Sequence, residues 1–166
     1  QYTGEYEKAA LDIDSALQIE PEDKLILLLN IELFIILRKL EKAEKLLSRI
    51  EKLYPDDEQF KVHKAWLLVV KGEKESALKQ FEESNGGRSD KIILYSLMGL
   101  KDETFELMKA LQNEDVQRSR YLRYKNLRWY DSLRTDNRFK EIMTTEKERY
   151  ERLLKQYGNM NKYHVF

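Results

Sequence analysis

The sequence predicts an all-α fold, a solenoid of helix–turn–helix repeats, from its composition and from a period of 34 residues. Its 166 residues include only 6 Gly and 2 Pro, while 42% are hydrophobic and 36% charged, a balance that favours helices. Ala9, Ala43 and Ala77 are 34 residues apart, and Pro21 and Pro55 have the same separation. A large apolar residue follows each alanine by four positions, which places an apolar stripe on one face of a helix.

Each recurring residue has a structural role in such a repeat. Gly4 and Gly72 stand five residues before an alanine and would permit the tight turn between two helices. The alanine keeps the side chain small where the two helices cross. The proline ends the second helix, and Asp56 with Gln59 is expected to form a capping box for the next one.

On these residues the chain resembles the tetratricopeptide-repeat (TPR) family. The stretch from Gly4 through Ala9 and Ala16 to Pro21 resembles the second helix of that motif nearly position for position. No first helix precedes it, so the chain is expected to begin in mid-repeat, with earlier repeats removed, and to leave an apolar face exposed on helix 4–19. The expected repeats cover residues 1–21 (a second helix only), 22–55, 56–89 and a degenerate 90–112.

The period places the expected helices and their breaks. They cover about residues 25–37, 40–53, 58–70, 73–84 and 90–98. Gly86 and Gly87 are expected to end the helix before them in the left-handed conformation. Thr104 follows Ala77 by only 27 residues in the alanine place, which indicates a shortened last repeat.

Residues 113–158 are expected to form a helical C-terminal cap. The stretch from Trp129 to Ile142 resembles a tail common in bacterial TPR-containing regulators, with Asn137 where those tails usually carry proline. This resemblance implies that apolar side chains of the stretch close the open end of the solenoid core. They are Trp129, Leu133 and Phe139.

The rest of the cap is expected to form one more helix. Thr145 with Glu148 predicts a capping box that opens a helix over 146–157, which Gly158 ends. Residues 159–166 have no periodicity and are expected to be a flexible tail.

Catalysis, metal binding and cofactor binding find no support in the sequence. There is no cysteine, and the two histidines, His63 and His164, have no carboxylate at helical spacing for a metal site. Phosphate-binding loops, dinucleotide fingerprints and nucleophile elbows are absent. We therefore expect no catalytic residues, no metal and no cofactor. The compartment stays open, with a cytoplasmic location preferred to a periplasmic one.

The favoured function is protein–protein interaction or scaffolding within a larger, bacterial regulatory protein. In TPR arrays the first helix of each repeat lines a concave groove, and the resemblance carries this role to nine residues here. They are Leu25, Leu28, Glu32, Ile35, Gln59, Val62, His63, Trp66 and Val69. Their apolar character suits a partner helix or an extended apolar peptide. Alternatively, the chain's own C-terminal helix or a second copy fills the groove.

Two further alternatives stay open at this stage. Residues 117–140 carry eight basic side chains against two acidic ones, interleaved with aromatic residues, a pattern that can bind nucleic acid. The residues that would carry it are Arg118, Arg120, Arg123, Lys125 and Arg128. The net charge of zero for the whole chain argues against it.

The repeats could also serve self-association alone, as a homo-oligomer. No stretch is long and apolar enough to predict membrane insertion.

Overall fold

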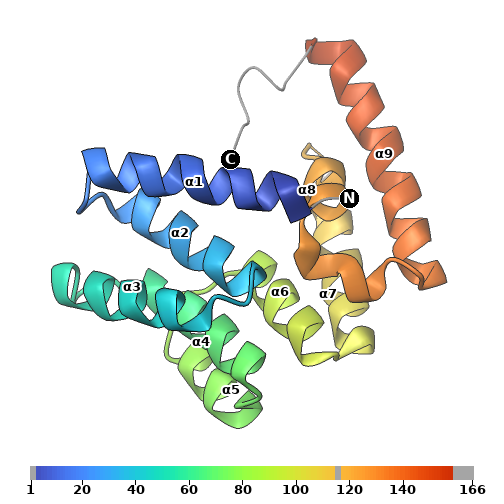
Figure 1. The fold of residues 1–166 in the computed structure, drawn as a ribbon. Helices are drawn as coiled ribbons and strands as arrows, with labels where there is room; N and C mark the ends of the chain where they lie inside the picture. The colour runs from blue at the N-terminus through green and yellow to red at the C-terminus, as the bar shows by residue number, and fades with distance from the viewer. Residues whose placement is uncertain (1–2, 115–116, 159–166) are drawn as a thin grey trace. The chain divides into compact units, whose positions relative to one another are not determined.

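The computed structural model describes residues 3–114 and 117–158, which divide into two compact units, Gln1–Met98 (unit 1) and Gly99–Phe166 (unit 2). The predicted tail over 159–166 lies outside the described residues. Every regular element of the described residues is helical (Figure 1). Unit 1 contains α1 (Thr3–Ile19), α2 (Lys24–Ile36), α3 (Leu40–Leu53), α4 (Gln59–Lys71), α5 (Lys74–Glu82) and α6 (Arg88–Met98).

The helices of unit 1 follow the predicted 34-residue register. α2 packs against α1, α3 and α4, and α4 packs in turn against α5 and α6 (Figure 1). Ala43 and Ala77 are fully buried, as expected where helices cross. Leu47 and Ile50, at the next positions of the stripe in α3, are buried with them. Unit 1 is therefore an all-α solenoid of stacked helix pairs.

The turn between the paired helices recurs with the period. Gly72 ends α4 in the left-handed conformation, with a φ of 91°, as its predicted role requires. Thirty-four residues earlier the same place is held by Arg38, which is also left-handed with a φ of 58°. Gly4, one period earlier still, lies inside α1 and not at a turn.

Two predicted helix ends are corrected by the structure. The N-cap of α4 is Glu58, whose side chain makes no capping hydrogen bond, and the carboxylate that accepts the Gln59 N–H, at 2.8 Å, belongs to Asp57 and not to Asp56. Gly86 and Gly87 follow α5 without adopting the left-handed conformation. Gly86 is required for space, because a Cβ there would lie 2.7 Å from the Phe81 ring.

Unit 2 contains α7 (Lys101–Glu114), α8 (Tyr121–Asn126), the 3₁₀ helix η1 (Arg128–Leu133) and α9 (Asn137–Tyr157). Its core includes the predicted Trp129, Leu133 and Phe139, which are all buried. That they close the solenoid stays a prediction. None of the described helices has the length and apolar character that a bilayer crossing requires.

The last helix begins earlier than the predicted capping box. Asp136 is the N-cap of α9, and its carboxylate accepts the Arg138 N–H at 2.9 Å. Thr145 lies in mid-helix, where its hydroxyl donates to the Glu141 carbonyl at 3.4 Å. The Thr145–Glu148 pair therefore caps nothing, and the prediction was wrong because a local signature cannot show that a helix has already begun.

Candidate functional site

Most of the nine predicted groove residues form the core of unit 1 rather than an open surface. The buried members are Leu28, Ile35, Val62, His63, Trp66 and Val69. Glu32 is half-buried, while Gln59 and Leu25 are exposed, Leu25 by 55%. The expectation that these apolar side chains line an open groove is therefore wrong. Helical spacing correctly placed them on a common face, but neighbouring helices cover that face.

Trp66 shows how α4 is enclosed. Its indole Nε1 donates to the backbone carbonyl of Asp90 in α6 at 3.2 Å. Its ring lies 4.8 Å from the His63 ring, one turn earlier in α4. Val62, a turn before Trp66, has its Cγ2 at 3.0 Å from the place of a Cβ on Gly86. These contacts hold α4 against α6 and against the connection that precedes α6.

His63 is a buried, electrically neutral member of this core. Its Nδ1 lies 3.3 Å from the Gln59 carbonyl. Burial lowers the pKa of His63 below its usual 6.5, although the carboxylates of Glu32 and Asp90 act in the opposite direction. The side chain therefore supports packing, and no group of three or more potential metal ligands occurs among the described residues.

The accessible part of the site lies at the start of the first helices. Leu25 in α2 and Gln59 in α4 are one period apart, and both side chains reach solvent. Between them, Lys24 forms an ion pair with Asp57. The hydrogen bond from Lys24, followed by that from the Gln59 N–H, lowers the pKa of Asp57. The surface here is mixed, with an exposed leucine beside a paired charge.

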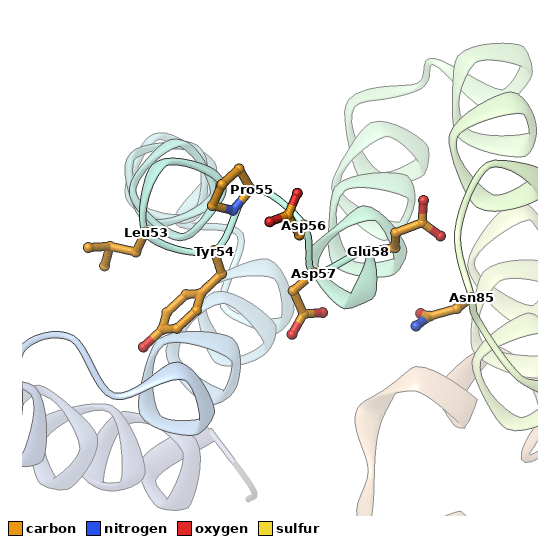
Figure 2. A pocket seen from close by; sticks show the side chains of 7 residues that line it. All are labelled: Leu53, Tyr54, Pro55, Asp56, Asp57, Glu58 and Asn85. Carbon is orange, nitrogen blue, oxygen red and sulfur yellow. The ribbon is translucent and has the colours of Figure 1, made fainter.

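A shallow depression of about 740 Å³ lies at the α3–α4 connection (Figure 2). It is lined by Leu53, Tyr54, Pro55, Asp56, Asp57, Glu58 and Asn85. Figure 2 shows Glu58 pointing toward Asn85, and Tyr54 reaching the other way. The Tyr54 hydroxyl donates to the Glu22 carbonyl at 2.5 Å, and Glu58 pairs with Lys61 at 3.1 Å. Asp57 is occupied by the Lys24 ion pair and the Gln59 N–H, whereas Asp56 is exposed.

The basic stretch of unit 2 lacks most of the stacking surface that nucleic-acid binding would need. Tyr124, Trp129 and Tyr130 are buried, and the Tyr124 and Tyr130 rings meet edge to face at 5.0 Å. Tyr121 is half-exposed and its ring centroid lies 5.6 Å from that of Tyr150. The predicted cations are exposed or half-exposed: Arg118, Arg120, Arg123, Lys125 and Arg128. They therefore form a charged surface without an open aromatic row.

A buried charged network in unit 2 was missed by the sequence analysis. Glu146 has no exposed area, and its carboxylate accepts hydrogen bonds from Gln112 at 3.1 Å, Arg149 at 3.2 Å and the Arg120 N–H at 2.6 Å. The Ser119 hydroxyl donates to the Glu146 carbonyl at 2.8 Å. The network ties α7, the start of α8 and α9 together. The available signal was that Glu146 and Arg149 fall on the apolar stripe of α9.

Comparison with known proteins bears on the repeat unit. A family model described as tetratricopeptide repeat matches residues 3–67, which span α1, α2, α3 and the first two turns of α4. Residues 3–67 belong to the tetratricopeptide-repeat family. No curated protein and no solved structure matches the chain significantly. TPRs generally mediate protein–protein interaction or scaffolding and are typically non-catalytic.

Proposed function

We propose that this protein is a non-catalytic scaffold module that holds a peptide or helix of a partner protein along the first helices of its TPR unit. The observation that carries the proposal is the recurrence of accessible side chains at one register position, Leu25 in α2 and Gln59 in α4. Glu32, half-buried in α2, adds a carboxylate that the partner can contact.

The buried residues of the predicted groove support this surface from behind. Leu28 and Ile35 fix α2, and Val62, Trp66 and Val69 fix α4. A backbone that is already rigid loses less conformational entropy when a partner binds, so the entropic cost of binding at these positions is smaller. The apolar peptide or helix therefore contacts Leu25 directly and the buried members only through the backbone that they position.

The wider context is also part of the proposal. We infer that the module belongs to a larger bacterial regulatory protein, because the segment from Trp129 to Ile142 resembles the tails of such regulators. Nucleic-acid binding is the weaker alternative, since unit 2 offers exposed cations but only Tyr121 as a half-exposed ring of the stretch.

Site-specific photocrosslinking tests the proposed surface in the full-length protein. A photoreactive residue replaces Gln59, and the matched control replaces Lys45, which is exposed on the second helix α3. We expect a partner adduct from position 59, little from position 45, and loss of the adduct when Leu25→Glu is added. Circular dichroism should show unchanged helicity, because all three replaced side chains are exposed. Equal adducts at both positions, or none at either, would exclude the surface.

A further inference from the structure

A single asparagine of the sequence is followed directly by glycine, Asn85 before Gly86. The pair lies in the connection between α5 and α6, outside any helix. The other asparagines of the described residues lie within helices, and each precedes a residue with a large side chain. They are Asn30, Asn113, Asn126 and Asn137. Asn85 therefore differs from them both in its backbone and in the residue that follows it.

This pair places a nucleophile beside an electrophile. The Gly86 backbone nitrogen and the Asn85 Cγ belong to adjacent residues, and a ring closes when the nitrogen attacks the carbon. A side chain on the following residue obstructs that approach, and glycine has none. Helical hydrogen bonds also hold a backbone in one conformation, whereas the Asn85 backbone lies outside the helices. Sequence and local structure therefore favour reaction at the same residue.

Few contacts restrain Asn85. Its side chain is exposed, and among the described residues neither its amide nor its backbone takes part in a hydrogen bond. The Gly86 N–H donates to the Ser84 Oγ at 3.2 Å, at the long end of the usual range. Release of the Gly86 nitrogen therefore breaks one long hydrogen bond and no helical one.

Asn85 borders an acidic surface. It lines the depression at the α3–α4 connection together with Asp56 and Glu58, and Glu58 points toward it (Figure 2). Glu58 pairs with Lys61 at 3.1 Å, and the Lys61 Nζ also donates to the Glu83 carbonyl at 3.3 Å. A carboxylate at position 85 would add a like charge beside Glu58. Conversion of the amide to an acid would therefore change the electrostatics of this depression.

We propose that Asn85 is a site of spontaneous deamidation. The Gly86 nitrogen loses its proton to hydroxide and attacks the Asn85 Cγ, so a C–N bond forms, and the side-chain nitrogen leaves as ammonia. Water then adds to either carbonyl carbon of the resulting succinimide ring and opens it, which leaves aspartate or isoaspartate. Water is the only co-reactant, and nothing is oxidised or reduced. The inference goes beyond the proposed function and needs no partner, so a failure of one leaves the other standing.

The two products should affect unit 1 differently. Aspartate changes only the charge of an exposed side chain. Isoaspartate carries the main chain through the former side chain, which lengthens the backbone by one carbon atom just before Gly86. A Cβ on Gly86 would already lie 2.7 Å from the Phe81 ring and 3.0 Å from Val62 Cγ2, so the backbone has no room on that side. We therefore expect isoaspartate to weaken the packing of this connection against α4 and α5.

Peptide mapping by mass spectrometry tests the site in the folded chain. The protein is incubated at mildly alkaline pH in heavy-oxygen water and then digested in ordinary water, so only acid formed during the incubation is labelled. We expect Asn85 to become an acid that carries one heavy oxygen, at a rate that increases with pH. Asn113 and Asn137, which are exposed but helical, are the internal controls and should react far more slowly. A urea-unfolded sample reports the reactivity of the sequence alone.

Four variants separate the steps. Asn85→Gln closes the corresponding larger ring far more slowly and should lose the label at position 85. Ser84→Ala removes the acceptor of the Gly86 N–H and should increase the rate, whereas Gly87→Ala leaves the attacking nitrogen unchanged and should not. Asn85→Asp carries the charge without the longer backbone, so its urea midpoint should match that of the fresh wild type. Aged protein that contains isoaspartate should unfold at a lower urea concentration than Asn85→Asp.

Three results would overturn the inference. Absence of label at residue 85 of the folded chain would do so, and reaction of the unfolded chain alone would assign the protection to the packing around Gly86. Equal labelling of Asn85, Asn113 and Asn137 would remove the role of the glycine. Label that persists in the same peptide of Asn85→Gln would assign the reaction to another residue.

Discussion

Arg38 and Gly72 hold the same place in successive repeats, and both adopt the left-handed backbone conformation, with φ of 58° and 91°. After each of them, the N–H of the next residue donates to the carbonyl five residues before it, at 2.8 and 2.9 Å. A residue other than glycine in this conformation lowers the stability of the fold by about 1–2 kcal/mol. The repeat therefore imposes the turn even where the sequence offers no glycine.

Replacing Arg38 by glycine is expected to stabilise unit 1 by about 1 kcal/mol, because the strain is relieved. The exposed hydrogen bond from Arg38 Nη1 to the Val70 carbonyl, at 3.3 Å, offsets part of the gain. Urea unfolding can be followed by Trp66 in a Trp129→Phe background, since the chain has two tryptophans, one in each unit. The matched variant Gly72→Ala should lower stability. Its Cβ would meet no atom within 4 Å, so the loss would be conformational.

Gly86 and Gly87 should respond differently to alanine. A Cβ on Gly86 would lie 2.7 Å from Phe81 Cε2 and 3.0 Å from Val62 Cγ2, which is closer than van der Waals contact allows. We expect Gly86→Ala to lower the free energy of unfolding by about 1–3 kcal/mol. Gly87→Ala meets nothing nearer than 3.7 Å and serves as the control, with a change within about 0.5 kcal/mol. Equal urea midpoints for the two variants would contradict this packing.

Asn30 is a buried amide in α2 with no exposed area. Neither its amide nitrogen nor its amide oxygen has a hydrogen-bond partner among the described residues. Asn30→Leu keeps nearly the same shape and removes the desolvation cost, so we expect stabilisation by about 1–3 kcal/mol. The urea midpoint measures it. Asn30→Asp is the companion variant and should be strongly destabilising; a destabilised leucine variant would instead show that the amide is hydrogen-bonded in solution.

The stability of unit 1 should decrease at acidic pH because of His63. Burial lowers the pKa of His63 in the folded state below its usual 6.5, so the unfolded chain binds the proton more readily. The stability that unit 1 gains from keeping His63 neutral is complete above about pH 6.5. It is lost as the pH falls below that value, because the unfolded chain then takes up the proton first. His63→Leu should flatten the dependence of the urea midpoint on pH between about 7.5 and 5.5. A slope unchanged in that variant would assign the effect to other groups.

In unit 2, removal of the charge on Glu146 should be costly. Glu146→Gln leaves Arg149, which is 8% exposed, without its anionic partner at 3.2 Å. Breaking a buried pair from one side costs about 3–5 kcal/mol. Trp129 fluorescence in a Trp66→Phe background reports this unit. Glu148→Gln, at an exposed position in the same helix, should leave the midpoint unchanged, and equal effects of the two substitutions would show that the network adds no stability.

The 34-residue period was the most informative feature of the sequence. It predicted α2, α3 and α4 to within one residue at each end, because alanine at a helix crossing and a residue at a left-handed turn are local requirements. The same reasoning was wrong at Gly86 and Gly87. A glycine can be required for its backbone or for its lack of a side chain, and sequence alone does not separate the two.

The candidate site was less predictable than the fold. Helical spacing placed Val62, Trp66 and Val69 on one face, but only the fold shows that helices such as α6 cover them. The Glu146 network was missed for the opposite reason. The places of Glu146 and Arg149 on the apolar stripe of α9 indicate burial, but they do not show that Gln112, 34 residues before Glu146, supplies a hydrogen-bond partner.

Within the described part of unit 1, α1 packs extensively against α2 alone, and this has a consequence for how the unit unfolds. In an array where each helix pair is stabilised by the next, opening starts at the end with the fewest contacts and proceeds inward. Amide protons of α1 would then exchange with solvent sooner than those of α3, whose Ala43 is fully enclosed. α1 would then also be the first helix of unit 1 that a protease can cleave.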